Sequence, residues 1–332
     1  MKEKPLLAIT MGDAGGIGPE VTVKALSGSA VGRVCRPLVI GDMALLEKCR
    51  AFTPRPVRFI LARDASDIHP EASAVPVINP CRRIREHRWG VIRRAYGEAA
   101  MGYVRFAVDA ALSRTVDGIV TAPICKEAIH RAGYRYQGHT DYLAHLTGAA
   151  RCAMMLTGRG LRVVLVTIHI PLAEVRRRLG RAMILDTIRL AHDACVRLGI
   201  RRPRVGVCGA NPHAGEGGAF GREEIEEIAP AIKAAAREGI CARGPFPADT
   251  IFVETHRRNF DVIIAMYHDQ GLIPLKMLAF DVGVNVTLGL SIVRTSPDHG
   301  TAFDIAGRGI ADPGSMVEAI ALAARLCHRT HE

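Results

Sequence analysis

Short apolar runs alternate with longer amphipathic segments along the whole chain, and this alternation limits the possible folds more than any other feature. Parallel strands buried on both faces have such continuous apolar runs, and the helices between them repeat apolar residues about every 3.6 positions. The pattern therefore predicts an α/β protein with a largely parallel sheet. Nine runs are expected to be strands: residues 6–10, 38–40, 57–61, 75–78, 118–121, 163–167, 205–208, 262–266 and 284–287.

The helical period is clearest in two segments near the middle of the chain. Their apolar positions are Ile184, Ile188, Ala191, Cys195 and Leu198 in one, and Ile225, Ile228, Ile232 and Ala235 in the other. With 332 residues the chain can bury large cores, so we expect two domains.

The composition excludes several classes of protein. The 44 basic and 33 acidic residues give a formal charge of +11, but basic residues are dispersed and aromatic residues make up only 5%, so a solvated surface is favoured over a nucleic-acid partner. The nine cysteines form no CxxC pair, which argues against a thiolate zinc site. No apolar run reaches the roughly 18 residues of a membrane span and no signal peptide is evident, so we expect a cytoplasmic protein without a membrane partner.

Residues 266–309 carry an unusual density of charged, amide and imidazole side chains between glycines. The predicted strand 262–266 runs directly into His268 and Asp269, which places polar groups at the carboxyl end of a strand, where open α/β sheets bind ligands. An ammonium, an amide and a guanidinium suited to phosphate or carboxylate follow at Lys276, Asn285 and Arg294. Ordinary surface ion pairing is the alternative for this trio.

Three histidines each follow a predicted strand: His169, His213 and His268. They would converge if the three strands are neighbours in the sheet, and three imidazoles with open positions are a typical catalytic site for zinc or another divalent metal. Separate, hydrogen-bonded structural histidines remain the alternative.

Two further glycine-containing turns lie at predicted strand or helix ends. The first strand enters MGDAGGIGPE, which begins a GxGxxG pattern at Gly16, but Val21 occupies the third glycine position, so a Rossmann loop is disfavoured. This turn either caps the strand or contacts a ligand. His139 and Thr140 open a helix whose first amides could face an anion.

Several long motifs in order are similar to one known family. These are MGDAGGIGPE, TAPICKEA, GHTDYLA, IHIPL, NPHAGEGG, MYHDQGLIPLK, GVNVTLGL and RTSPDHGTAFDIAGRG. Over essentially its whole length the chain resembles the 4-hydroxythreonine-4-phosphate dehydrogenase (PdxA) family of vitamin B6 biosynthesis. The last motif is also similar to the adenine-side loop of isopropylmalate and isocitrate dehydrogenases. The resemblance implies their non-Rossmann fold, in which two α/β/α domains flank a cleft and a homodimer shares its active sites between subunits.

On this basis we expect residues 1–124 and 276–332 to form a first α/β domain with the cofactor loops. Residues 125–275 are expected to form a second domain with the metal histidines and the dimer contacts.

The resemblance also implies roles for individual residues. His169, His213 and His268 would bind a divalent metal, and one of the three would come from the second subunit of the dimer. Zinc is the expected metal, and cobalt, magnesium and manganese are the alternatives. The substrate would be bound by His139, Thr140, Lys276, Asn285 and Arg294. NAD or NADP would contact Gly12, Asp13, His299, Gly300, Thr301 and Asp304. Catalytic groups near the reacting carbon would be Asp249, Asp269 and Lys276, with the base unassigned among them.

The implied reaction is the oxidation and decarboxylation of 4-phosphohydroxy-L-threonine to 3-amino-2-oxopropyl phosphate. Three departures from the family pattern leave the substrate open: Asp141 stands where the family usually has Glu, Ala14-Gly15-Gly16 where it has Pro-Ala-Gly, and Ser291 where it has Pro. The alternatives are paralogues that oxidise 4-phospho-D-threonate, 4-phospho-D-erythronate or the dihydrodiol of terephthalate. The retained trio of Lys276, Asn285 and Arg294 favours a small phosphorylated hydroxy acid.

Overall fold

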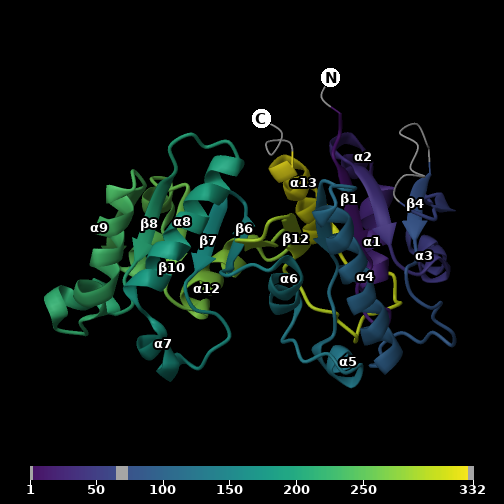
Figure 1. Ribbon diagram of the computed structural model, residues 1–332, viewed down its shortest axis with the longest axis horizontal. Helices are drawn as coiled ribbons and strands as arrows, with labels where there is room; N and C mark the ends of the chain where they lie inside the picture. The colour runs from purple at the N-terminus through teal and green to yellow at the C-terminus, as the bar shows by residue number, and fades with distance from the viewer. Residues whose placement is uncertain (1–2, 65–73, 328–332) are drawn as a thin grey trace. The chain divides into compact units, whose positions relative to one another are not determined.

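The computed structural model describes residues 3–64 and 74–327, which fall into two compact units (Figure 1). Unit 1 comprises Met1–Cys152 with Leu290–Glu332, and unit 2 comprises Ala153–Gly289. Each unit is a sheet with helices packed on it, so the predicted α/β class is confirmed. None of the helices in the described ranges is long and apolar enough to cross a membrane.

Unit 1 is built on six parallel strands in the order β3-β4-β2-β1-β5-β12. Every residue of β1 and β5 is buried, so both faces of the sheet centre are covered by helices. The strands are β1 (Leu6–Thr10), β2 (Arg36–Ile40), β3 (Phe59–Leu61), β4 (Val75–Ile78), β5 (Gly118–Thr121) and β12 (Val293–Pro297). The helices are α1 (Gly18–Ser27), α2 (Ser29–Val34), α3 (Met43–Cys49), η1 (Arg50–Phe52), α4 (Arg94–Leu112), α5 (Lys126–Arg131), α6 (His139–Thr147) and α13 (Gly314–Cys327).

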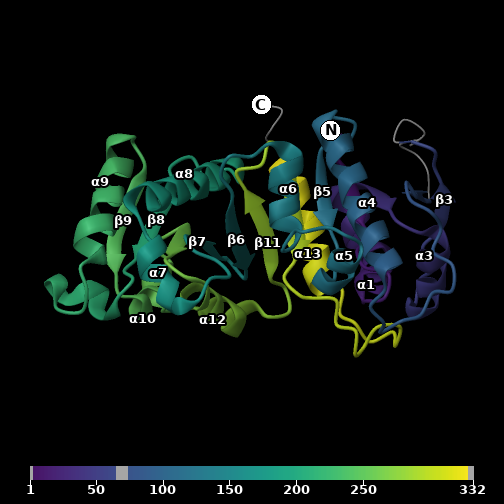
Figure 2. The ribbon, with the colours of Figure 1, turned by 60° about the horizontal axis from the view of Figure 1, so that its bottom comes forward.

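Unit 2 has the strand order β11-β6-β7-β10-β8-β9, antiparallel from β11 to β7 and parallel from β7 to β9. Figure 2 shows α8 and α12 on opposite sides of these strands, which explains why all of β10 is buried. The strands are β6 (Ala153–Gly158), β7 (Leu161–Leu165), β8 (Arg204–Cys208), β9 (Cys241–Phe246), β10 (Val262–Ala265) and β11 (Val284–Leu288). The helices are α7 (Leu172–Arg178), α8 (Arg181–Arg197), η3 (Pro212–Gly218), η4 (Glu224–Ile228), α9 (Ala229–Arg237), α10 (Ala248–Ile251), α11 (Glu254–Arg257) and α12 (His268–Ala279).

All nine predicted strands are present, and both strongly periodic segments are helical. Three strands were not predicted: β6, β9 and β12. Strand β9 has the sequence CARGPF and a mostly exposed edge position, where glycine and proline are tolerated. Strand β12 has the polar sequence VRTSP although every residue in it is buried. A search for continuous apolar runs therefore finds neither an exposed edge strand such as β9 nor a buried strand of polar residues such as β12.

The units divide the chain differently from the expected domains for residues 125–152 and 276–289. Helices α5 and α6 pack on α4, which keeps them with unit 1. Strand β11 pairs along its whole length with β6, which keeps it with unit 2. The expected assignment of cofactor and dimer roles to the two domains stays a prediction.

Candidate active site

Two of the predicted metal histidines lie side by side in unit 2. Strands β7, β10 and β8 are neighbours, as convergence of the three histidines required. Beyond β7 the backbone stays bonded to the end of β10, because the Thr167 amide and hydroxyl both donate to the Met266 carbonyl oxygen at 3.2 and 2.7 Å. The ring centroids of His169 and His268 are 5.7 Å apart.

His268 has a hydrogen bond that orients its ring. Its Nδ1 lies 2.7 Å from Oδ1 of Asp269, so the carboxylate accepts the Nδ1 proton and the Nε2 lone pair is left for a ligand. Gln270 fixes the same turn, since its side-chain oxygen accepts from the Met266 amide and its Nε2 donates to the Gly209 carbonyl at 2.8 Å. The turn carrying His268 is thereby tied to the end of β8.

His213 lies in a left-handed turn. In η3 the φ angles of His213, Ala214 and Glu216 are 53°, 53° and 42°, a region that costs roughly 1–2 kcal/mol for each residue with a side chain. Gly209 lies against this turn so closely that a Cβ there would be 2.8 Å from Cα of Ala214. Strain of this kind occurs where the surrounding structure holds a functional side chain in place.

Buried Glu224 holds this turn. Its Oε1 accepts from the amides of Ala210 and Asn211, both at 2.8 Å, and its Oε2 accepts from the Asn211 side chain at 2.9 Å. Hydrogen bonds to a charged group contribute about 1.5–3 kcal/mol each, so three of them match the cost of three strained residues. Glu224 was not predicted as a site residue, because it lies in the acidic segment GREEIEE, which reads as a solvated helix face.

Glu224→Gln is expected to lower the free energy of unfolding by about 2–3 kcal/mol, because an amide places donors against backbone donors. Denaturant unfolding of the purified protein measures this. Glu226→Gln is the matched control; Glu226 is 56% exposed and pairs with Arg222, and this change should be close to neutral. Equal stability of the two variants would show that Glu224 does not hold the turn in place.

The two paired rings suit one metal ion. A ring nitrogen binds zinc at about 2.0–2.1 Å, which places two ring centroids on one ion roughly 5–6 Å apart. The observed 5.7 Å fits this range. His213 is not close to the pair, and in residues 3–64 and 74–327 no group of three histidine, cysteine or acidic side chains could hold a metal. The three-histidine site therefore stays a prediction.

The remaining unit 2 candidates are spread over three elements. Lys276 is on α12 with its Nζ 5.8 Å from the Phe280 ring centroid. Asn285 is on β11, and its buried Oδ1 has no hydrogen-bond partner among the described residues. Asp249 is exposed on α10. That these residues share one site with the histidine pair stays a prediction.

In unit 1 a buried guanidinium lies beside a neutral histidine. Arg294 on β12 is 3% exposed, and its Nε and Nη2 donate to the Thr121 hydroxyl at 3.1 and 2.7 Å. Burial lowers the pKa of Arg294 to about 9, so the group stays charged at neutral pH. Enclosure of the ring, and then the charge of Arg294, hold the pKa of His139 well below its usual range. Nε2 of His139 is buried and has no hydrogen-bond partner among the described residues, although the residue as a whole is only half-buried. Thr140 is the next residue of α6.

The two groups of predicted cofactor residues meet in unit 1. The Ile17 amide donates to the Thr301 carbonyl at 2.9 Å, joining the opening turn to the loop that contains His299, Gly300, Thr301 and Asp304. Gly12 has φ of 71°, and a Cβ there would be 2.3 Å from the Pro123 carbonyl oxygen. Nε2 of His299 is buried and unpartnered within the described chain. The sequence placed these residues together, and their contact with a cofactor remains a prediction.

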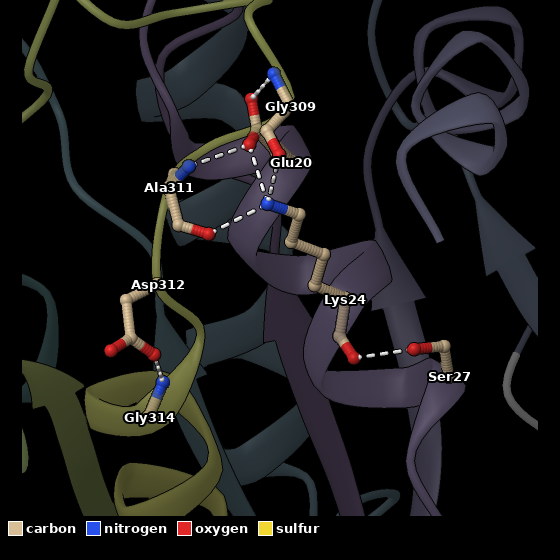
Figure 3. Close-up of polar contacts among 7 residues, drawn as sticks. All are labelled: Glu20, Lys24, Ser27, Gly309, Ala311, Asp312 and Gly314. Carbon is tan, nitrogen blue, oxygen red and sulfur yellow. Dashed lines mark hydrogen bonds and ion pairs between the residues drawn. The ribbon is translucent and has the colours of Figure 1, made fainter. Parts of the chain in front are cut away.

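Two residues of α1 hold the far end of that loop (Figure 3). Lys24 Nζ donates to the Gly309 and Ala311 carbonyls at 2.8 and 2.7 Å and to Glu20 Oε1 at 2.9 Å. Buried Glu20 accepts in return from the amides of Gly309 and Ala311. This reciprocal pairing, which spans more than 280 residues of sequence, was not predicted.

Asp13 is fully buried beside this loop, and its pKa is perturbed. Burial raises the pKa to about 6, against backbone hydrogen bonds from Gly15, Cys125 and Gly16 that lower it. One carboxylate oxygen, Oδ2, has no partner among the described residues. A buried carboxyl that titrates near neutral pH is typical of a functional site.

Asp13→Asn is expected to change how stability depends on pH. The folded pKa lies above the unfolded one, so the folded state binds the extra proton and wild-type stability falls as pH rises from about 4 to about 6, then levels off. The variant lacks this loss and should be more stable than wild type by up to about 3 kcal/mol above pH 6, and equal to it below about pH 4. Denaturant unfolding across this pH range measures the difference. A difference that does not change with pH would contradict the raised pKa.

Comparisons with known proteins agree with the resemblance. A family model described as pyridoxal phosphate biosynthetic protein PdxA matches residues 33–323. A D-threonate 4-phosphate dehydrogenase from Cupriavidus necator is 44% identical over 326 residues, 98% of each chain. A 4-hydroxythreonine-4-phosphate dehydrogenase from Desulforapulum autotrophicum is 47% identical over 325 residues, 97% of this chain and 95% of that one. The crystal structure of a 4-hydroxythreonine-4-phosphate dehydrogenase from Burkholderia phymatum is similar with a TM-score of 0.85 and 45% identity, covering 98% of this chain and 99% of that chain.

Proposed function

The chain belongs to the PdxA family of dehydrogenases, and from this premise we propose that it oxidises and decarboxylates a phosphorylated four-carbon hydroxy acid with NAD and a divalent metal. The observation that carries the proposal is the pair formed by His169 and His268, with Asp269 orienting the second ring. The donor set is neutral imidazole, which suits zinc, cobalt or manganese.

The proposed substrate is 4-phosphohydroxy-L-threonine. Oxidation at C3 would give a β-keto acid, and loss of carbon dioxide would leave 3-amino-2-oxopropyl phosphate. D-threonate 4-phosphate is the second candidate, because a relative named for it is 44% identical over almost the entire chain. The same two steps on that substrate would release dihydroxyacetone phosphate. A charged guanidinium such as Arg294 supports a phosphorylated substrate in both cases.

The predicted site residues would have two roles in this reaction, metal binding and substrate binding. His169, His213 and His268 would hold the ion, with one of them supplied by the second subunit. When bound, the ion supplies Lewis acidity toward the substrate oxygens and the nicotinamide supplies the hydride acceptor. Arg294, Lys276, Asn285, His139 and Thr140 would bind the substrate, the two cations taking the phosphate.

One hydrogen bond reduces the number of residues that can act as the general base. Asp269 already accepts the Nδ1 proton of His268, so we assign it the orientation of that ring rather than proton transfer. Asp249, which is exposed, and Lys276 remain as the candidate bases of the predicted set.

A homodimer would complete the metal site, and α12 offers a surface for it. Ile273, Met277 and Phe280 are 58%, 84% and 81% exposed, at positions that share one face of the helix that begins at His268. Large apolar side chains exposed to this degree in one stripe typically mark a protein interface. We therefore propose that this α12 stripe meets the second subunit.

Met277→Asp/Phe280→Asp is expected to weaken dimerisation at least about 100-fold, since each buried side chain contributes about 1.5–3 kcal/mol. Sedimentation equilibrium measures the dissociation constant. Leu112→Asp is the control, a 44% exposed residue at the end of α4. Dimers of unchanged affinity in the double variant would exclude α12 from the interface.

The proposed function is tested by following NADH formation by metal-reconstituted protein. The candidate substrates are 4-phosphohydroxy-L-threonine, 4-phospho-D-threonate, 4-phospho-D-erythronate and the dihydrodiol of terephthalate. The highest kcat/KM on 4-phosphohydroxy-L-threonine, with release of carbon dioxide, is the expected result. A higher kcat/KM on another phosphorylated acid would support the proposed reaction type and assign a different substrate to it. Turnover of the dihydrodiol alone, or full activity without metal, would overturn the proposal.

A further inference from the structure

Unit 2 has a second polar site at the opposite end of its sheet from the histidines. A hollow of about 380 Å³ opens where β7, β8 and β10 begin, whereas His169, His213 and His268 follow the points where these strands end. Five arginines line this arginine hollow: Arg159, Arg162, Arg204, Arg257 and Arg258. The register of the parallel strands sets Arg204 beside Asp261 and Arg162 beside Val262 at this edge.

Carboxylates neutralise three of the five guanidiniums. Arg204 grips Asp261 through Nε and Nη2, both at 3.1 Å, and Arg258 pairs with Glu254. Arg159 pairs with Asp281 at 2.8 Å. Although burial raises the pKa of Asp261, hydrogen bonds from Arg204 outweigh this and lower it, so Asp261 is committed to Arg204.

Two guanidiniums, those of Arg162 and Arg257, form no salt bridge of their own with a carboxylate among the described residues. Arg162 is half-buried and donates through Nη1 to the Asp261 carbonyl oxygen at 3.1 Å, which directs its head group along the hollow's edge. Arg257, also half-buried, pairs with no carboxylate in the described part of the chain. Five guanidiniums against the three paired carboxylates Glu254, Asp261 and Asp281 leave a formal +2.

Guanidinium forks match phosphoryl oxygens, and like charges held together in one hollow are stabilised when an anion enters. The volume falls in the range of sites for small metabolites, and Phe260 adds an apolar wall. We propose that the arginine hollow binds a small phosphate-bearing anion, at a site separate from the histidine site of the same unit.

Inorganic pyrophosphate is the probe, titrated calorimetrically into the full chain at constant ionic strength, because surface electrostatics weaken with salt. Saturable binding is expected for wild type. Arg162→Gln/Arg257→Gln should raise the dissociation constant at least about tenfold, while KM for the best substrate stays unchanged. Arg257→Gln alone, which removes no side-chain hydrogen bond or salt bridge to the described residues, should show part of the same loss.

The matched control is Lys233→Gln/Arg237→Gln on α9, which removes two positive charges from the exposed face of a helix in the same unit. It should bind pyrophosphate like wild type. Absence of saturable binding to wild type, an unchanged dissociation constant in both hollow variants, or equal weakening in the control would each overturn the proposal. An unchanged constant would assign any observed binding to the substrate site.

Discussion

His268→Ala is expected to lower kcat at least about 10³-fold, because it removes a proposed metal ligand and with it several kcal/mol of charge stabilisation during the proposed reaction. The ring lies at the exposed start of α12, 38% accessible, so the fold should be retained. Rates of NADH formation and the bound metal, determined by elemental analysis, should fall together. His169→Ala is expected to behave in the same way, since the two rings are 5.7 Å apart.

His256→Ala is the matched control, an exposed histidine on α11 with no expected role. Asp269→Asn separates orientation from proton transfer. An orienting carboxylate predicts a metal affinity about 10–100-fold weaker, with kcat recovering at saturating metal. A kcat that stays low at saturating metal would instead make Asp269 the base. Full activity of a metal-free His268→Ala protein would refute the metal role altogether.

Arg294→Met should lower kcat/KM for the phosphorylated substrate by about 10³-fold or more, since the buried guanidinium that we propose to donate to the phosphate is lost. Arg294→Lys keeps the charge but not the planar fork, and should retain part of the activity. Steady-state kinetics of both variants measure the loss, and thermal melting checks that each is folded.

Thr121→Val tests how the guanidinium is positioned. It removes the hydroxyl that accepts from Nε and Nη2 of Arg294 without removing the charge, and a loss of about tenfold in kcat/KM is expected. An Arg294→Met protein that is folded and has an unchanged kcat/KM would place the phosphate elsewhere, with Lys276 as the remaining predicted cation.

The family and the α/β class could be predicted from sequence because they depend on local patterns. Parallel strand ends meet at one edge of a sheet, so histidines that follow apolar runs are expected to approach one another. His169 and His268 do lie side by side, whereas the convergence of all three histidines stays a prediction. The distance between the two histidine rings could not be predicted from the sequence, because it depends on which strands pair. Strands β7 and β10 pair although they are almost 100 residues apart in the chain.

The supporting residues could not be predicted because each acts on a distant partner. Glu224 holds a turn more than ten residues upstream through backbone amides, and backbone groups leave no pattern in a sequence. The left-handed φ of His213 and Ala214 is equally hidden, since both residue types normally avoid that region. The i,i+4 spacing of Glu20 and Lys24 indicates that they can pair with each other, but not that fully buried Glu20 and half-buried Lys24 contact residues 309–311.

Unit 1 is assembled from two separate pieces of the chain, and this sets an order of events during synthesis. Strand β12 and helix α13 leave the ribosome only after all 137 residues of Ala153–Gly289, which takes roughly 7–27 s at about 5–20 residues/s. Unit 2 is continuous and can close its sheet in that interval, whereas β5 waits with one edge unpaired. An open parallel edge attracts other chains. We therefore expect chains that end near residue 289 to aggregate through β5, and nascent chains to need protection until Leu290–Glu332 has been synthesised.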